Sequence, residues 1–166
     1  MTTTSGTSYT LERVDWADPR AAALRDAMDA EMGARYASAG PMSAAAQAAL
    51  TVDPAAVRHV VLAVDHDGTP IGHAALRDHG GELEVKRVVV AAGQRGRGVG
   101  RAIMSEVERL ARAAGAGRVI MQTGDRQPEA ESLYTALGWT RIPTYPPYDT
   151  ALPLQSRCYE KRLTVG

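Results

Sequence analysis

The sequence contains no phenylalanine, a single cysteine and no excess of either charge. With one cysteine, Cys158, the chain cannot form an internal disulfide, which fits a reducing cytoplasm. Its 19 Lys and Arg residues equal its 19 Asp and Glu residues, so the broad basic surface of a nucleic-acid-binding protein is absent. No stretch reaches the roughly 18–20 consecutive apolar residues that a membrane span requires. We therefore predict a cytoplasmic protein with neither nucleic acid nor membrane as partner.

The length of 166 residues fits one domain with a full hydrophobic core. We predict a flexible tail over residues 1–8, which are rich in Thr and Ser, and a single domain over residues 9–166. The tail lacks the basic start and the apolar stretch of a secretory signal. The four histidines show no metal-ligand spacing such as His-x3-His, so we predict no metal.

Apolar spacing and turn residues predict the order of the structural elements. A strand is expected over 9–16, and Asp18-Pro19 is typical of the capped start of a helix that ends near 35–36. The remaining elements, in chain order, are a short helix at 43–50, strands at 57–64, 71–77 and 82–90, a helix at 99–114, a strand at 118–123, a helix at 128–137, and strands at 139–144 and 156–163. The fold class is therefore α/β, with a mixed, mainly antiparallel sheet of about seven strands flanked by about four helices. The early strands form a meander, and the later strand–helix–strand units form right-handed parallel crossovers.

The segment between the strand at 82–90 and the helix at 99–114 combines glycine with arginine. The first N–H groups of a helix have no internal partner, and the helix dipole adds positive charge there. Glycine lets a ligand approach the backbone, and arginine adds fixed charge. The sequence therefore predicts a site for a di-anion such as a pyrophosphate. The residues concerned are Arg95, Gly96, Arg97, Gly98, Val99, Gly100 and Arg101.

Two familiar phosphate-binding patterns do not fit this loop. Gly93 and Gly98 have the P-loop spacing, but Val99 stands where the lysine is required. The dinucleotide fingerprint, started at Gly96, would place Arg101 at its final glycine, and it also requires a preceding parallel β-α-β unit. The remaining alternative is a surface loop kept soluble by arginine. Such a loop has no need of three alternating glycines followed at once by an amphipathic helix.

The pattern that does fit is Arg-x-x-Gly-x-Gly, and it is one of several motifs in order. They are Glu-Val-Lys-Arg (84–87), Arg-Gly-Arg-Gly-Val-Gly (95–100), Thr-Gly-x-x-Gln-Pro-Glu-Ala (123–130), Leu-Tyr (133–134), Leu-Gly-Trp (137–139) and Tyr-Glu-Lys-Arg-Leu (159–163). With them the chain resembles the Gcn5-related N-acetyltransferase (GNAT) superfamily, in particular its small bacterial members. The resemblance is strong from about residue 82 to 163 and weak over the first 55 residues, where the acceptor site would be built.

The resemblance implies a GNAT-like fold and acetyl-CoA as co-substrate. The strand end at Val88, Val89 and Val90 would separate from the strand at 118–123, and the pantetheine arm would pair with backbone groups of Val88 and Val90. The N–H of Val90 would polarise the thioester carbonyl. Gln127 stands where many relatives have an asparagine that reaches toward the cofactor, and glutamine keeps the same donor and acceptor. The implied CoA-binding residues are thus 88–90, 95–101 and Gln127.

Two residues match catalytic positions of the superfamily. Tyr134 matches the tyrosine that protonates the CoA sulfur, although its apolar helix stripe also suits a core residue. Glu84 matches a strand carboxylate that serves as base, often through water. Its rival role is an ion pair with Lys86, and Glu82 is the fallback base.

These residues imply an N-acetyltransferase that moves an acetyl group from acetyl-CoA to a primary amine by direct attack in a ternary complex. The acceptor is a small molecule, amino acid or peptide. A catalytically silent module that senses acyl-CoA is the alternative, and a homodimer is an open alternative to a monomer. The aromatic loop 145–148 lines the acceptor pocket opposite Arg35 and Tyr36, or else is pinned to the surface.

Overall fold

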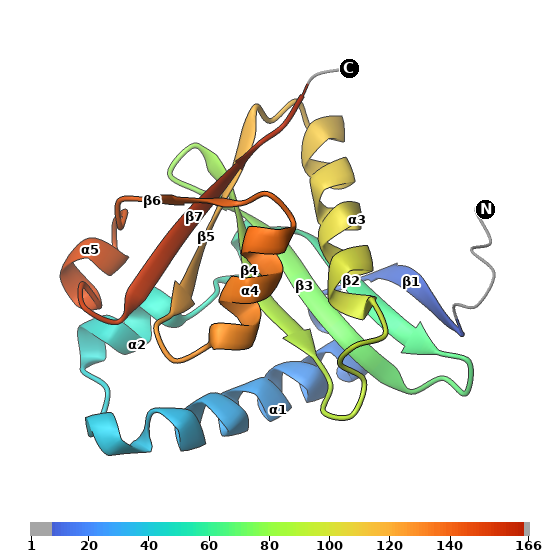
Figure 1. Ribbon diagram of the computed structural model, residues 1–166, viewed down its shortest axis with the longest axis horizontal. Coiled ribbons are helices and arrows are strands. Elements are labelled where there is room, and N and C mark those ends of the chain that lie inside the picture. The colour runs from blue at the N-terminus through green and yellow to red at the C-terminus, as the bar shows by residue number, and fades with distance from the viewer. Residues whose placement is uncertain (1–7, 165–166) are drawn as a thin grey trace.

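The fold is built on one sheet of seven strands, in the spatial order β1-β2-β3-β4-β5-β7-β6, seen in the computed structural model of Figure 1. The structure describes residues 8–164, so the predicted tail lies outside the described residues except for Ser8. The strands are β1 (Tyr9–Val14), β2 (Val57–Asp65), β3 (Pro70–His79), β4 (Glu82–Val90), β5 (Arg118–Gly124), β6 (Thr140–Ile142) and β7 (Ser156–Arg162). The mixed, mainly antiparallel seven-stranded sheet predicted from the sequence is confirmed.

Five α-helices lie within residues 8–164, and the helix start predicted at Asp18-Pro19 is confirmed. They are α1 (Pro19–Arg35), α2 (Ala44–Leu50), α3 (Val99–Ala113), α4 (Pro128–Ala136) and α5 (Tyr148–Ala151), with short 3-10 turns at Ala37–Ala39 and Pro54–Ala56. The Asp18 carboxylate accepts from the N–H of Arg20 at the start of α1, and Ser43 caps α2 in the same way. The one-turn helix α5 was not predicted. None of the helices within residues 8–164 combines the length and the apolar character that crossing a membrane requires.

The first four strands form the expected antiparallel meander, whereas the order of the last three strands differs from the expected one. Strands β1 to β4 pair antiparallel, and α3 connects β4 to its parallel neighbour β5. Strand β6 runs in the same direction as β5, but β7 lies between them and is antiparallel to both. Because β7 pairs with β5 along its whole length, the chain end fills the position that a simple crossover would give to β6.

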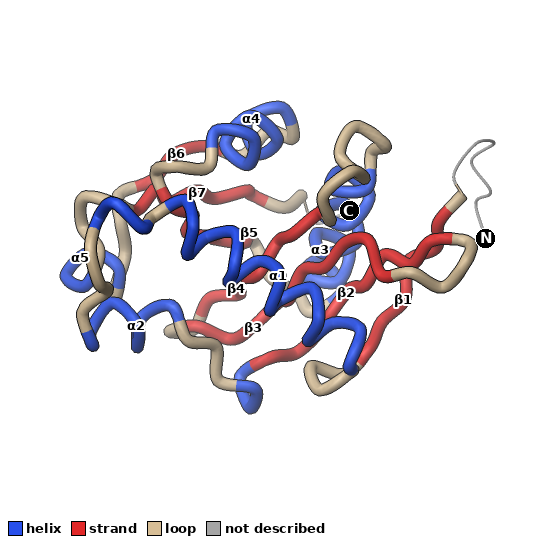
Figure 2. The backbone as a smooth tube through the Cα atoms, turned by 90° about the horizontal axis from the view of Figure 1, so that it is seen from below, coloured by secondary structure: helices blue, strands red, loops and turns tan. Residues whose placement is uncertain are grey.

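The sheet separates two apolar layers. In β2, Val61 and Ala63 pack with α3 and α4, whereas Val60, Leu62 and Val64 pack with α1. This is the alternation that a strand buried on both faces must show. Figure 2 shows α1 running along the face of the sheet opposite α3.

A bulge in β4 creates the feature on which the site depends. The β3–β4 register shifts between the pairs His73↔Val89 and Ala75↔Lys86, and Arg87 within the shift has a positive φ of 58°. On its other side, β4 pairs with β5 at only three residues, Leu83, Glu84 and Val85. Beyond them the two strands diverge, as Figure 1 shows, so the end of β4 lacks a neighbour on that side.

Candidate active site

The predicted anion site is a cleft of about 340 Å³ between the end of β4, the start of α3 and α4. Gly98 caps α3 with a left-handed φ of 77°, and the first helical bond runs from the Ala102 N–H to the Gly98 carbonyl at 3.0 Å. The three preceding N–H groups therefore have no partner within the helix. The predicted CoA-binding residues that line this cleft are Val88, Val89, Val90, Arg95, Gly96, Gly98, Val99, Gly100, Arg101 and Gln127.

Two glycines of the loop serve different physical needs. A Cβ on Gly98 would meet nothing within 4 Å, so its surroundings are open, but its φ disfavours any other residue. A Cβ on Gly100 would lie 3.0 Å from Leu133 and 3.5 Å from Val90. Gly100 therefore allows α3 to approach α4 and β4 closely, while Gly98 leaves the helix start accessible.

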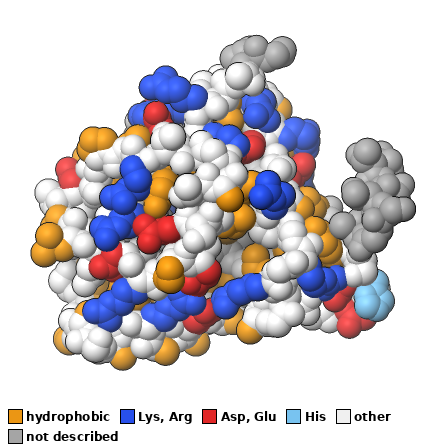
Figure 3. Space-filling model, in the orientation of Figure 1, with side chains coloured by type: hydrophobic (Ala, Val, Ile, Leu, Met, Phe, Trp, Pro, Cys, Tyr) orange, Lys and Arg blue, Asp and Glu red, His pale blue; other side chains and the backbone are white. Residues whose placement is uncertain are grey.

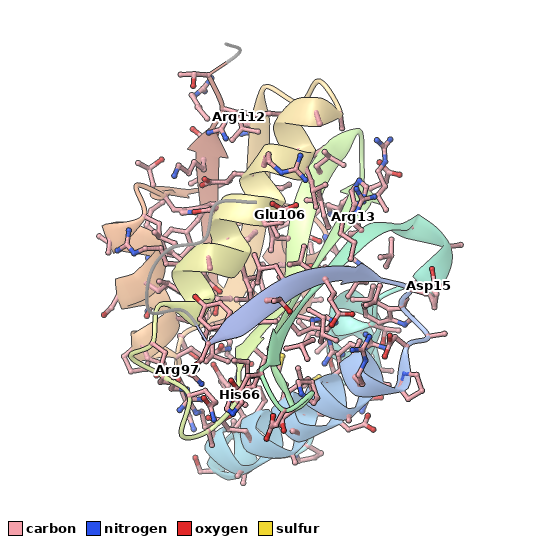
Figure 4. All side chains as sticks on the ribbon, turned by 90° about the vertical axis from the view of Figure 1, so that its right-hand side faces the viewer. Arg13, Asp15, His66, Arg97, Glu106 and Arg112 are labelled. Atoms are coloured by element: carbon pink, nitrogen blue, oxygen red, sulfur yellow. The ribbon has the colours of Figure 1, made fainter. Side chains whose placement is uncertain are left out.

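The loop arginines point in different directions. Arg95 is exposed beside the cleft and forms an ion pair with Glu31 of α1 at 3.1 Å. Arg97 instead turns toward Asp65, at 3.5 Å, and is the predicted CoA-binding residue that does not line the cleft. Figure 4 shows Arg97 over the β2–β3 turn, near the labelled His66. The positive charge at the cleft therefore comes from Arg95, Arg101 and the helix start.

The end of β4 presents backbone donors to the gap between β4 and β5. The Ala91 N–H donates to the Ile71 carbonyl on the β3 side, at 2.9 Å. N–H groups alternate in direction along a strand, so those of Val90 and Val88 face away from β3. Strand β5 does not pair with this part of β4, so both N–H groups can bind a ligand in the gap.

A second cavity, of about 610 Å³, adjoins the first. Five residues line both cavities, and this shared lining marks where the cavities meet. They are Met28, Met32, Val88, Gln127 and Tyr134. Tyr134 is 4% exposed, and its ring packs at a tilt against the rings of Trp139 and Tyr159. Its hydroxyl forms no hydrogen bond with another residue in the part of the chain that the structure describes. Burial raises the pKa of Tyr134 above its ordinary value, so the phenol stays protonated at neutral pH. Tyr134 is thus a core residue whose hydroxyl is free to donate a hydrogen bond where the two cavities meet.

The second cavity has an apolar wall and a polar floor. Its apolar wall draws on α1, the loop before α2, α2 itself, β5 and the segment after α5, and it includes Met28, Met32, Met42, Leu50, Met121 and Leu152. Its polar floor includes Lys86 and Gln122 from the diverging strands. Figure 3 shows basic and acidic side chains interspersed along α1, with apolar side chains between that helix and the sheet.

Glu84 lies beneath this floor and does not line either cavity. It is completely buried and forms an ion pair with Arg77 at 2.7 Å. Its other oxygen accepts from the hydroxyls of Tyr145 at 2.5 Å and Tyr148 at 3.1 Å. Burial raises the pKa of Glu84, but Lys86, Tyr145 and Arg77 together hold it below the usual value. Glu82, the fallback base, pairs with Arg118 at 2.7 Å and also lies outside both cavities.

Lys86 was expected as the ion-pair partner of Glu84, but that partner is Arg77. The Lys86 ammonium donates to the Tyr148 hydroxyl at 3.0 Å and to the Gln122 side chain at 3.4 Å. Lys86 is 6% exposed, and burial lowers its pKa to about 8. Lys86 thus lines the second cavity, which sequence reasoning missed. The signal in the sequence was that Lys86 shares a strand face with Glu84, the carboxylate predicted to act at the site.

The aromatic loop 145–148 does not line the cavity, because Tyr145 and Tyr148 turn inward to Glu84. Of the two residues expected opposite this loop, Tyr36 lines the cavity and accepts from the Arg126 N–H at 2.9 Å. Arg35 instead forms ion pairs with Glu31 and Glu129. Within residues 8–164, no group of three or more His, Cys, Asp or Glu side chains has the proximity that a metal ion requires.

With this geometry established, comparisons with known proteins identify the family. The sequence profile of the Acetyltransferase (GNAT) family matches residues 21–139. The chain belongs to this family. A mycothiol acetyltransferase from Nocardia farcinica is 34% identical over 127 residues, which cover 75% of this chain and 40% of the relative. An IAA acetyltransferase from Azospirillum brasilense is 34% identical over 89 residues, which cover 52% and 58% of the two chains. The GNAT chain thus spans about half the length of these curated relatives.

Solved structures support the same fold. A Klebsiella pneumoniae chain assigned to the acyl-CoA N-acyltransferases superposes with a TM-score of 0.76 at 26% identity, covering 94% of this chain and 98% of that one. The PaiA N-acetyltransferase from Thermoplasma acidophilum, solved with coenzyme A, gives a TM-score of 0.64 at 15% identity, covering 92% and 99%. At that identity the second likeness shows the GNAT fold alone.

Proposed function

We propose that this protein is an acetyl-CoA-dependent N-acetyltransferase whose acceptor is the primary amine of a small molecule, amino acid or peptide. The observation that carries the proposal is the junction of two cavities at Tyr134 and Val88. One cavity has the features of a diphosphate cradle, and the other is large enough for a separate molecule. A donor and an acceptor held in these cavities meet directly, as transfer in a ternary complex requires.

The donor side of the proposal rests on the start of α3. The free N–H groups after Gly98, with Arg95 and Arg101 beside them, suit the diphosphate of CoA. The gap between β4 and β5 suits the pantetheine arm, since Val88 and Val90 present unpaired backbone groups there. Gln127 lines both cavities and offers an amide near the thioester end. The acetyltransferase names of both curated relatives also support an acetyl donor.

In the proposed reaction, the acceptor nitrogen attacks the thioester carbonyl carbon. A C–N bond forms, the C–S bond breaks, and the departing thiolate takes up a proton. The Val90 N–H polarises the carbonyl, and the Tyr134 phenol supplies the proton because burial keeps it un-ionised. Glu84 is hydrogen-bonded at both oxygens and lines neither cavity, so we assign it a positioning role through Tyr148 and Lys86. An acceptor that enters as the neutral amine loses one proton as the amide forms. That proton restores the Tyr134 phenol, so no further base on the protein is needed.

The test is release of free thiol from acetyl-CoA in the presence of a panel of primary amines. Amine-dependent release, with the acetylated amine detected by mass spectrometry, supports an enzyme. Binding of acetyl-CoA without amine-dependent release would instead favour the acyl-CoA-sensing module. Tyr134 at the cavity junction argues for turnover, because a sensor has no use for a proton donor there. The homodimer stays a prediction, which sizing the protein with and without CoA would test.

A further inference from the structure

The second cavity, which is the proposed acceptor site, combines one buried cation, an apolar wall and a junction with the donor cleft. Resting on the proposed function, we propose that its acceptor is an apolar amino acid: an amine with a free carboxylate close to the nitrogen and an aliphatic or aromatic side chain. Lys86 binds the carboxylate, and the methionine-rich wall holds the side chain. The amine then lies at the junction beside Tyr134.

Lys86 is a buried cation without a carboxylate of its own. Its bonds go to the Tyr148 hydroxyl and the Gln122 amide oxygen, and it forms no ion pair with any residue between 8 and 164. Glu84, whose charge acts on Lys86, is already paired with Arg77. The cluster of Arg77, Glu84, Lys86 and Tyr148 therefore holds two cations against one anion. Burying a cation without a partner is costly, so an anionic group on the acceptor would complete the cluster.

The charge of the cavity also excludes a class of acceptors. Within the described residues, Asp29 is the only acidic residue in its lining, and it is paired with Arg87. No free carboxylate in the lining is therefore left to bind a second ammonium group. A polyamine or another polycation would place that group near Lys86 and Arg87. Like charges at short range in a low-dielectric site are unfavourable, so such acceptors are disfavoured.

The apolar wall suits an uncharged side chain of variable shape. It consists of Met28, Met32, Met42, Leu50, Met121 and Leu152. Methionine is unbranched and polarisable, so a wall rich in methionine adapts to aliphatic and aromatic groups alike. The cavity of about 610 Å³ also lies within the ordinary range for small-molecule sites.

The spacing along β4 favours a short link between amine and carboxylate. Val88, at the junction, lies only two residues beyond Lys86 on the same strand. That separation is at most about 7 Å along the strand, and the bulge at Arg87 shortens it. The flexible Lys86 side chain reaches over part of this distance. A carboxylate a few bonds from the nitrogen fits this spacing, as in an α- or β-amino acid.

The test compares each amino acid with its own carboxamide. Phenylalanine, leucine and methionine are assayed beside their amides for kcat/KM in thiol release, and for calorimetric binding to the CoA-saturated protein. The amide keeps the size and removes the negative charge. Because the amide's amine is less basic, a larger fraction of it is neutral at pH 7, which favours the amide in the absence of carboxylate binding. A higher kcat/KM for the acid than for its amide therefore shows that the site binds the carboxylate.

The matched variants are Lys86→Met, which keeps the length and apolar stem of the side chain, and Lys161→Met. Lys161 is the only other lysine of the chain, and it pairs with Glu108 outside both cavities. We expect the acids to exceed their amides by about 10- to 100-fold in the wild type and in Lys161→Met. In Lys86→Met the ratio falls to one or below, while the binding of CoA is unchanged.

Equal kcat/KM for acids and amides in the wild type would overturn this inference while leaving the acetyltransferase function supported. An acid preference that survives in Lys86→Met would also overturn it, because another group would then read the carboxylate. If no acid is either turned over or bound, the inference is again overturned. Calorimetric binding of CoA then reports separately on the proposed donor site.

Discussion

His73 is hydrogen-bonded to the backbone carbonyl of Arg87, with its Nδ1 at 2.8 Å from that oxygen. A carbonyl only accepts, so Nδ1 carries the proton and Nε2 accepts from the Arg25 guanidinium at 3.0 Å. Arg87 is the residue with positive φ in the β4 bulge. The neutral His73 ring therefore stabilises the bulge beyond which β4 leaves β5, and with it the gap proposed for the pantetheine arm.

The first prediction concerns acid stability. Burial lowers the pKa of His73 from 6.5 to about 4. Above pH 6.5 neither the folded nor the unfolded chain protonates this ring. As the pH falls from 6.5 toward 4, the unfolded chain takes up a proton that the folded protein excludes. Folding stability is therefore lost over that window, by on the order of 3 kcal/mol.

Urea unfolding of the wild type and His73→Gln at several pH values measures this loss. Glutamine can donate to the Arg87 carbonyl and accept from Arg25 but does not titrate, so we expect a flatter pH dependence. His66→Gln is the control, because the His66 side chain is 75% exposed, and it should follow the wild type. Parallel curves for wild type and His73→Gln would contradict the prediction.

The second prediction concerns Tyr134. In Tyr134→Phe the ring still packs against Trp139 and Tyr159, but the departing thiolate loses its proton donor. We expect kcat to fall by about 100-fold, with little change in the affinity for CoA or in the melting temperature. Steady-state kinetics, calorimetry and thermal unfolding measure the three quantities. Undiminished turnover in the variant would reject the role of the hydroxyl.

The third prediction distinguishes a positioning role of Glu84 from the role of a general base. Glu84→Gln leaves Arg77 buried without a counter-charge, so we expect the free energy of unfolding to fall by roughly 3 kcal/mol. A positioning residue should leave the acidic limb of the pH profile of kcat/KM in place in the surviving activity, because that limb reports the protonation of a general base. A variant of normal stability whose profile loses that limb would instead identify Glu84 as the base.

Local patterns in the sequence predict the elements whose causes are local. The turns after β2 and β3, the cap at Asp18 and the start of α3 all depend on residues within a few positions of each other. The glycines at 96, 98 and 100 were therefore placed correctly at a strand-to-helix turn.

The features that sequence reasoning missed depend on distant contacts. Arg87 adopts a positive φ that its own side chain disfavours, and its carbonyl is held by His73, fourteen residues away. The insertion of β7 between β5 and β6 depends on strand pairing that apolar spacing does not encode. Lys86 lies at the cavity only because β4 and β5 diverge there.

The central claim is that the free amides at the start of α3 hold the CoA diphosphate, and calorimetric binding of CoA to two glycine variants tests it most directly. Gly98 and Gly115 have φ values of 77° and 82°, and a Cβ on either would meet nothing within 4 Å. Gly98→Ala and Gly115→Ala thus impose the same backbone strain, but only Gly98 adjoins the cleft. We predict that Gly98→Ala weakens CoA binding at least tenfold relative to Gly115→Ala, a difference of about 1.4 kcal/mol. Equal CoA affinities in the two variants, or no CoA binding by the wild type, would contradict the account.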